Sequence, residues 1–305
     1  MSHPLLEVEK LRVQFGAFAA LQDVTFDLAQ GETLGLVGES GSGKSTLARA
    51  ILRLIPVTSG SVRVQGEDLL SSGGAELRRR RRDLQIVFQD ALASLNPRMS
   101  IGDALAEPLK IYEPSLQKRA RAAQVALMLE RVGLSADMAR RYPHEFSGGQ
   151  CQRIGIARAM MLRPKLLVCD EPVSSLDVSI QGQIVNLLVD LQREFATAML
   201  FISHNLAVVR HLSHRILVIY RGRLVEVAAR DTLFATPAHP YTRTLLGRTP
   251  AQVDEPAEAP VSGGCAFHDR CAYAQASCLL AIPPLQEVSS GHFAACHRWR
   301  EVVYS

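Results

Sequence analysis

The sequence predicts a mixed α/β fold with a parallel sheet core, an antiparallel β subdomain, an inserted helical subdomain and a small cysteine-rich extension. Short, continuous apolar runs occupy residues 34–37, 166–169 and 199–202, which is typical of parallel strands buried on both faces. Alternating stretches lie near the N-terminus, and a long middle segment carries helical spacing. With 305 residues, the chain can form one large domain with an appendage.

Each part of this fold rests on a local pattern. Residues 6–15 largely alternate between apolar and polar, and so do 24–27 and 61–65, which favours half-exposed antiparallel strands. Residues 92–164 are helical in pattern, most clearly 117–132. We therefore expect one large domain over 1–235, with its helical subdomain at about 92–164, and an extension over 236–305. Residues 250–264 are rich in Pro, Ala, Glu and Gly, as linkers are.

The composition excludes several classes of protein. A hydrophobic fraction of 47% and a charged fraction of 21% are those of a globular chain. The net charge of +4 is too small to favour nucleic acid, and the arginine run at 78–82 is interpreted as a solvated face in preference to a lipid or nucleic-acid patch. The first residues lack a signal-peptide pattern, and no apolar run reaches the length of about 18 residues that spans a membrane. We expect a cytosolic protein.

A phosphate-binding loop is predicted at residues 38–45, where GESGSGKS fits the pattern G-x-x-x-x-G-K-[ST]. The motif follows an apolar strand and precedes a helical stretch at 46–52, so a merely structural glycine turn is disfavoured. Backbone N–H groups and the positive end of the helix dipole would bind phosphate, Lys44 would contact the β- and γ-phosphates, and Ser45 would bind Mg²⁺. The expected ATP-binding residues here are Gly38, Ser40, Gly41, Gly43, Lys44, Ser45 and Thr46.

Two carboxylates follow the buried strand at 166–169. Asp170 is expected to hold Mg²⁺, and Glu171 to polarise the water that attacks the γ-phosphate. Charged residues often simply end strands, so this pair carries weight only together with the other motifs.

Residues 146–150, FSGGQ, resemble the LSGGQ signature of ABC ATPases. The resemblance implies that Phe15 stacks on adenine, that Gln89 is the Q-loop glutamine and an Mg²⁺ ligand, that 174–177 form the D-loop, and that His204 is a catalytic switch histidine. Taken singly, Phe15 could be a packing ring, Gln89 an exposed strand end and His204 a core histidine; their order along the chain favours the family roles.

The signature implies a second subunit. Residues 147–149 precede an apparent helix at 152–162, so they form a second anion-binding helix start. In the family, the signature of one subunit closes over the nucleotide held by another, which predicts a pair of ATPases, with a heteromer favoured. The expected contacts are Ser147, Gly148, Gly149 and Gln150. Cys151 stands where many relatives carry a basic residue.

Three further segments resemble the oligopeptide, dipeptide and nickel importer branch: SLNPR at 94–98, YPHE at 142–145 and HPYT at 239–242. Asn96-Pro97 independently predicts a turn, and His239-Pro240 a break that excludes helix. The branch implies an ATPase for a peptide importer, with two permease chains and, indirectly, an extracytoplasmic binding protein as partners. Alternatives are an importer of nickel or another solute, a soluble ABC ATPase acting on nucleic acid or ribosomes, and a sensor without turnover.

Four of the six cysteines crowd the C-terminal region, at Cys265, Cys271, Cys278 and Cys296. In a reducing cytosol such a cluster favours metal ligation over disulfides. The tight pairs typical of structural zinc are missing. The branch resemblance implies a 4Fe-4S cluster, with zinc as the second interpretation and unligated buried cysteines as the third.

Overall fold

The computed structural model describes residues 4–248 and 263–304, and most of the predicted linker at 250–264 lies outside them. The chain forms two compact units that interleave along the sequence. The first contains residues 63–202 with two short N-terminal segments, and the second contains 8–26, 33–62 and 203–305. Both units mix strands and helices, which confirms the α/β class. The boundary predicted at 235/236 stays a prediction, because this division follows other limits.

The first unit is built on three parallel strands in the order β8-β7-β6. Every residue of β7 and β8 is buried, as the continuous apolar runs predict. Their bounds are β6 Leu84–Val87, β7 Leu166–Asp170 and β8 Ala198–Ile202. In the register of β7 and β8, Val168 lies opposite Leu200 and Asp170 opposite Ile202.

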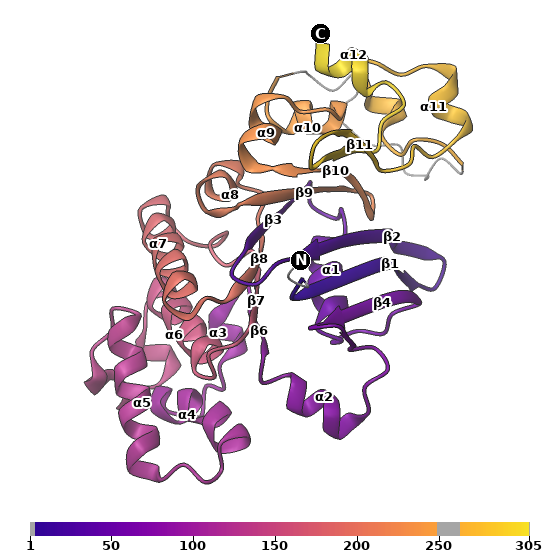
Figure 1. The fold of residues 1–305 in the computed structure, drawn as a ribbon. Helices are drawn as coiled ribbons and strands as arrows, with labels where there is room; N and C mark the ends of the chain where they lie inside the picture. Colours follow the sequence, from indigo (N-terminus) through magenta and orange to yellow (C-terminus); the bar gives the residue numbers. More distant parts are fainter. Residues whose placement is uncertain (1–3, 249–262, 305) are drawn as a thin grey trace. The chain divides into compact units, whose positions relative to one another are not determined.

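Helices make up most of the remainder of this unit (Figure 1). The predicted helical segment contains α3 Ala91–Ser94, α4 Ile101–Tyr112, α5 Lys118–Arg131, two 3-10 turns and α6 Gly148–Met160. Helices α4, α5 and α6 contact one another, and α6 also contacts β6 and α7, Val178–Phe195. The turn predicted at Asn96-Pro97 is confirmed, since the N–H of Met99 donates to the Asn96 carbonyl at 3.1 Å.

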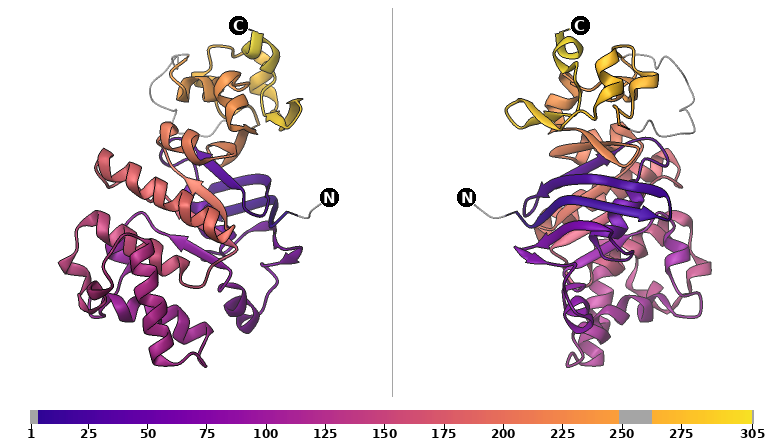
Figure 2. Two further views of the ribbon diagram at one scale, coloured as in Figure 1. Left: turned by 60° about the vertical axis from the view of Figure 1, so that its left-hand side comes forward. Right: turned by 90° about the vertical axis from the view of Figure 1, so that its right-hand side faces the viewer.

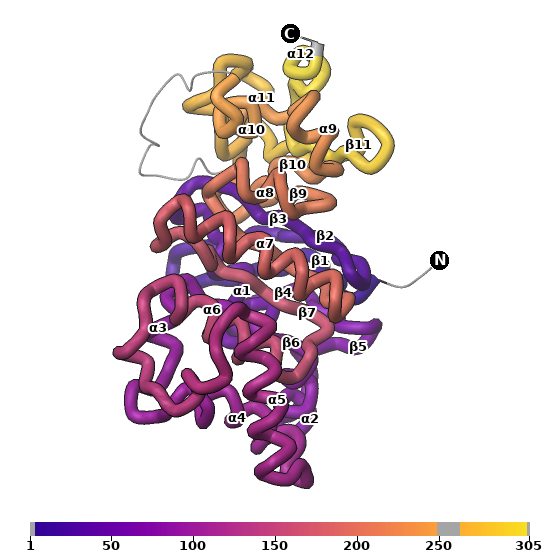
Figure 3. The backbone as a smooth tube through the Cα atoms, turned by 90° about the vertical axis from the view of Figure 1, so that its left-hand side faces the viewer, coloured from indigo at the N-terminus to yellow at the C-terminus, as the bar shows by residue number. Residues whose placement is uncertain are grey.

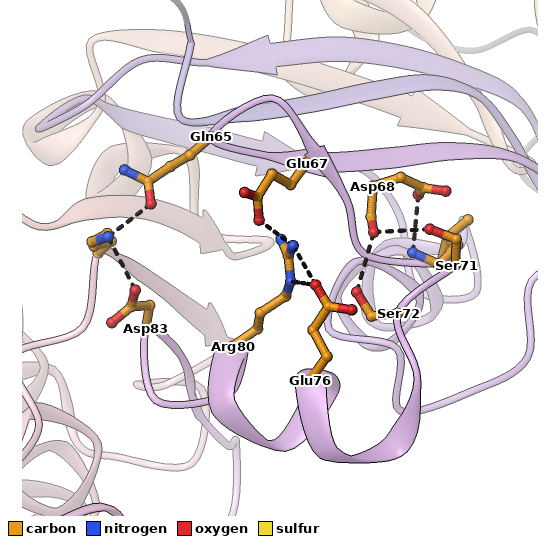
Figure 4. A network of polar contacts seen from close by, with 10 residues as sticks. Gln65, Glu67, Asp68, Ser71, Ser72, Glu76, Arg80 and Asp83 are labelled. Carbon is orange, nitrogen blue, oxygen red and sulfur yellow. Dashed lines mark hydrogen bonds and ion pairs between the residues drawn. The ribbon is translucent and has the colours of Figure 1, made fainter.

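The arginine run at 78–82 begins in the last turn of a short helix, α2 Gly74–Arg80, and continues past its end. Arg80 donates to Glu76 at 2.8 Å and also pairs with Glu67 of β5, Glu67–Asp68 (Figure 4). Arg82 donates to Glu113 at 2.8 Å. At least two of the five arginines therefore have carboxylate partners within the protein, which agrees with the interpretation as an ordinary solvated face.

The second unit contains the predicted antiparallel region. Strands β1 Leu6–Phe15 and β2 Phe18–Leu28 are joined by two residues and form a hairpin, and β4 Ser59–Val64 lies on the other side of β1 (Figure 2). Strands β1, β2 and β4 each continue into the first unit at one end. The bounds of β1 match the alternating stretch at both ends, because alternation reports burial on one face.

The same unit contains five more strands in the order β11-β12-β10-β9-β3. Strand β3 pairs with β9 in parallel, and β9, β10, β12 and β11 follow one another in antiparallel pairs. The bounds are β3 Thr33–Val37, β9 Arg215–Tyr220, β10 Arg223–Ala229, β11 Gln286–Ser289 and β12 His292–Ala294. The helices are α1 Lys44–Ile51, α8 Leu206–Leu212, α9 Arg230–Ala235, α10 Pro240–Leu245, α11 Ala276–Leu280 and α12 Trp299–Tyr304, and the last four are gathered near β10 (Figure 3).

The predicted break at His239-Pro240 is wrong. Pro240 is the first residue of α10, and the Nδ1 atom of His239 accepts a hydrogen bond from the Tyr241 N–H at 3.0 Å. Proline lacks an N–H that would be unpaired at a first helical position, and its fixed φ suits the helix, so it starts a helix as readily as it ends one. Within the described residues, no helix is both long and apolar enough to cross a bilayer.

Candidate functional site

The glycine-rich loop connects β3 to α1 in the second unit, and two of its glycines have a steric reason. A Cβ atom on Gly38 would lie 2.3 Å from the Ile219 carbonyl oxygen. Gly43 has φ +105°, and its Cβ would lie 2.8 Å from the Ala20 carbonyl oxygen. Any larger residue would therefore displace the loop.

Lys44 lies across this loop. Its ammonium donates to the carbonyl oxygens of Gly38 and Glu39, each at 2.8 Å, and the residue is buried. Ser40 and Gly41 are exposed at the loop's tip, whereas Ser45 and Thr46 are half-buried in the first turn of α1. The loop thus places a buried positive charge behind an exposed backbone curve, an arrangement suited to a polyphosphate.

Two other predicted residues belong to the same unit. Phe15 ends β1 with 48% of its surface exposed, so its ring is open to a stacking partner. His204 is exposed and follows Ser203, whose N–H donates to the Leu36 carbonyl at 3.2 Å. This bond brings the His204 segment beside β3, the strand that leads into the glycine-rich loop.

The first unit holds the two predicted carboxylates. Asp170 is the buried last residue of β7, and Glu171 follows it with a left-handed backbone, φ +49°. That conformation costs a residue with a side chain about 1–2 kcal/mol. The Glu171 N–H donates to the Ile202 carbonyl at 3.1 Å, and the Ser174 hydroxyl donates to the Glu171 carbonyl, also at 3.1 Å. These contacts fix the direction in which the carboxylate leaves the strand.

The signature segment starts a helix earlier than predicted. Helix α6 begins at Gly148, not at 152, and ends at Met160. The Ser147 Oγ accepts from the Gln150 N–H at 3.4 Å, and the Gln150 side chain accepts from the Ser147 N–H at 3.0 Å. This capping box closes the helix start. A Cβ on Gly149 would lie 2.8 Å from the Ile180 side chain, so that position is also sterically restricted.

The neighbours of the signature lie in the same unit. Cys151 is 2% exposed, and its thiol lies 3.7 Å from the Pro143 carbonyl, so it packs within the fold. Gln89 is exposed just beyond β6, and the Gln152 side chain donates to the neighbouring Phe88 carbonyl at 3.4 Å. Helix α6 therefore holds the Q-loop segment directly. The D-loop residues 174–177 lead into α7, with Asp177 at its N-cap position.

The four C-terminal cysteines line one pocket in the second unit, together with His268 and His297. All four cysteines are free thiols. Burial raises the pKa of Cys271 to about 11 and that of Cys296 to about 12. The Tyr273 N–H donates to the Cys271 sulfur at 3.4 Å, and the Arg298 N–H to the Cys296 sulfur at 3.3 Å.

These features fit a metal group held by thiolates. Backbone N–H donors stabilise thiolate sulfur, and a bound cation would supply the charge that burial otherwise disfavours. In the described part of the chain, however, no group of three or more His, Cys, Asp or Glu side chains is placed to hold a metal ion. The 4Fe-4S cluster and the zinc alternative therefore stay predictions.

Two residues that anchor the glycine-rich loop, Tyr241 and Arg270, are not predicted from the sequence to contact it. The Glu39 N–H donates to the Tyr241 hydroxyl at 2.7 Å, and Arg270 donates to both carboxylate oxygens of Glu39, at 2.8 and 2.9 Å. In the sequence, Tyr241 stands out only as part of the HPYT segment at 239–242. Arg270 precedes Cys271, and nothing in its local sequence indicates a partner 231 residues away.

Comparisons with known proteins agree with these features. Residues 21–174 match the family described as ABC transporter, and residues 225–278 match the oligopeptide/dipeptide transporter C-terminal region. A probable peptide ABC transporter ATP-binding protein of Sinorhizobium fredii is 48% identical and covers 97% of this chain and 90% of its own. The oligopeptide transport ATP-binding protein OppF of Salmonella typhimurium is 46% identical, over 96% and 95%.

A solved structure shows the same fold. It is a dimeric ATP-binding cassette in a post-hydrolysis state with ADP and phosphate bound, and it is 27% identical. The match has a TM-score of 0.68 and covers 74% of this chain and 98% of the other. The predicted fold of an ATP-binding cassette is confirmed.

Proposed function

The chain belongs to the ABC transporter family, and from this premise we propose how its residues divide the work of a peptide importer. It is an ATP-binding and ATP-hydrolysing subunit that powers such an importer, as its match to peptide-transport ATP-binding proteins over almost the whole chain shows. That match is the observation that carries the conclusion. We propose in addition the residue roles, the metal groups and the assembly.

The glycine-rich loop is proposed to bind the phosphates of ATP. Lys44 would exchange its two carbonyl partners for phosphate oxygens, which are stronger acceptors because they are charged. The exposed ring of Phe15 would stack on the adenine. Residues 1–235 would form the ATPase domain and 236–305 the extension.

Hydrolysis is assigned to Glu171 and His204. The carboxylate of Glu171 would orient the attacking water and accept its proton, and His204 would contact the γ-phosphate. The left-handed backbone of Glu171 supports this assignment, because strained conformations concentrate at functional residues. Mg²⁺, when bound, would neutralise phosphate charge; Ser45, Gln89 and Asp170 supply oxygen ligands of the kind it prefers.

Turnover is proposed to need a second ATPase subunit. Ser147, Gly148 and Gly149 at the start of α6 would contact the γ-phosphate of a nucleotide held by that subunit. The dimer with ADP and phosphate seen for a related cassette supports a paired state. We favour a heteromer. Gln150 is proposed to act mainly through the capping box, since its side chain accepts from Ser147.

The remaining partners follow from the importer function. We propose two transmembrane permease chains, an extracytoplasmic substrate-binding protein that acts through them, no nucleic acid, and a peripheral position on the cytoplasmic face of the inner membrane. The four cysteines are proposed to hold a 4Fe-4S cluster that braces the extension, with zinc as the alternative.

The test is isolation of the intact complex under anaerobic conditions. ATP turnover together with two hydrophobic permease chains would support the proposed function, whereas recovery with ribosomes or nucleic acid would contradict it. Iron and sulfide content near four per chain would support the cluster, and zinc alone would replace it. Cys271→Ser should lower the metal content, whereas the matched variant Cys151→Ala, in the packed signature segment, should not.

A further inference from the structure

Glu39 is the second residue of the phosphate-binding loop, and each of its polar groups has a partner. Its N–H donates to the Tyr241 hydroxyl at 2.7 Å. Its carbonyl accepts from the Ser42 N–H at 3.2 Å and from the Lys44 ammonium at 2.8 Å. Its carboxylate accepts both bonds from Arg270. Glu39 therefore bonds both to residues of the loop segment itself, Ser42 and Lys44, and to outside partners, Tyr241 and Arg270, which come from a distant part of the chain.

The outside partners come from the C-terminal region of the same unit. The side chain of Arg270 is only 8% exposed and that of Glu39 is 37% exposed, so the guanidinium is largely shielded from water while it makes two parallel bonds. Such bidentate pairs between arginine and a carboxylate are directional as well as strong. The Arg270 pair thus defines an orientation of the Glu39 side chain and not merely a charge contact.

The segment that carries Arg270 packs on a cluster of buried aromatic rings. Phe267, three residues earlier, packs on Tyr241 and Tyr220 with ring centroids 5.4 and 5.3 Å apart. Tyr241 is fully buried, and its ring also packs on Tyr220 at 4.5 Å. Cys271, which lines the cysteine pocket, follows Arg270 directly. One aromatic cluster therefore supports the arginine, the tyrosine and the edge of the pocket together.

We propose that Arg270, assisted by Tyr241, is a positioning residue for the phosphate-binding loop, so that the cysteine-rich extension sets the affinity of this subunit for ATP. A loop that is already fixed in its binding conformation loses less conformational entropy when the phosphates bind. Until phosphate oxygens replace it, the Glu39 carbonyl accepts a hydrogen bond from the Lys44 ammonium, so a change in the position of Glu39 also changes where the lysine meets the nucleotide.

The inference rests on the proposed nucleotide site, and the simpler explanation is an ion pair that only stabilises the fold. A structural pair would lower the thermal midpoint when broken but leave the affinity of the folded protein for ATP unchanged. A positioning pair would lower the affinity, and by linkage ATP would in turn protect the Arg270 segment. These two readouts separate the explanations.

The experiment compares Arg270→Met, Arg270→Lys, Glu39→Gln and the double variant Arg270→Met/Glu39→Gln in the full chain. ATP affinity is measured by equilibrium titration, with the thermal midpoint and the metal and sulfide content of each variant. We expect about a tenfold loss of affinity for Arg270→Met and partial recovery with lysine. The double variant should lose no more than the larger single loss, because both changes break one interaction. Arg230→Met is the matched control, since Arg230 makes a similar two-bond pair with Asp231 in its own helix.

Unchanged affinity in folded Arg270→Met, additive losses in the double variant, or an equal loss in Arg230→Met would each overturn the proposal. If Arg270→Met does not fold, amide exchange of the wild-type chain decides. A non-hydrolysable ATP analogue should slow exchange at residues 267–273, and unchanged exchange there would reject the inference. A wild-type chain that does not bind ATP at all would instead contradict the proposed function.

Discussion

Two helix starts with similar sequences are built in different ways. Helix α1 begins after Gly43, which has φ +105°, and no side chain caps it. Helix α6 begins after Ser147, and a reciprocal pair of side-chain bonds between Ser147 and Gln150 closes it. Both are rich in glycine and serine, and both were predicted to bind anions.

Because of this difference, the two helix starts present their backbone N–H groups to a phosphate to different extents. Uncapped helix starts present backbone N–H groups and the positive end of the dipole to a ligand. At α6 the protein's own side chains satisfy part of that demand, so the start is stable without a ligand. This difference agrees with the proposal that α6 meets a nucleotide only when a second subunit arrives and that α1 belongs to the half-site that would hold the nucleotide.

The largest expected effect comes from Glu171→Gln, which tests whether both helix starts serve one reaction. The amide keeps the shape of the side chain but cannot act as a base, so turnover should fall by about a thousandfold. ATP binding and ATP-dependent pairing should persist. Phosphate release and the mass of the complex in solution measure the two outcomes, and turnover at the wild-type rate would show that the base is assigned wrongly.

Lys44→Ala, at the start of α1, should lower the affinity for ATP more than any substitution at the start of α6. It removes the buried ammonium, and we expect a loss of ATP affinity of about a hundredfold. Equilibrium titration of the isolated chain measures it. Lys110→Ala is the control, because Lys110 forms an exposed pair with Asp103 in α4. Equal affinities for the two variants would refute the role of Lys44.

Substitutions of Ser147 can distinguish its role as a helix cap from a contact with an anion at the start of α6. Aspartate caps a helix about as well as serine, so Ser147→Asp should leave the free energy of unfolding within about 0.5 kcal/mol of the wild-type value. Its negative charge should nevertheless repel a phosphate and reduce ATP-dependent pairing by about tenfold. Ser147→Ala should cost about 1 kcal/mol of stability. Denaturant titration and a pairing assay separate these effects; normal pairing in Ser147→Asp would argue against a phosphate contact.

The smallest expected effect is that of Gln150→Ala, which removes one half of the capping box. The Ser147 N–H would lose its acceptor, and we expect a loss of about 0.5 kcal/mol in the free energy of unfolding. Gln124→Ala, at an exposed position in the middle of α5, is the control and should change stability very little. Equal values for both variants would mean that the capping box does not stabilise α6.

Elements that depend on a local residue pattern are predicted accurately, whereas elements that depend on contacts between particular side chains are not. Buried strands such as β7 and β8 were predicted closely, because a continuous apolar run directly reports burial on both faces. The start of α6 was predicted four residues too late. Glycines are poor helix formers, which hid the capping box that Ser147 and Gln150 supply. Pro240 was interpreted as a break for a similar reason, since proline is compatible with the first turn alone.

Local patterns in the sequence predict the order of the motifs, the strand that leads to the loop before Lys44, the strand that ends at Asp170, and the cysteines of the extension. Spacing and periodicity contain this information because they act over a few residues. The pairing of Arg270 with Glu39, 231 residues away, and the gathering of four separate cysteines around one pocket depend on tertiary contacts that no local pattern specifies. A guanidinium can donate to any carboxylate, so the chemistry of Arg270 does not specify which carboxylate in the chain becomes its partner. Glu39 follows β3, which pairs with β9, and Phe267 packs on Tyr220 at the end of β9, so these contacts bring this particular pair together.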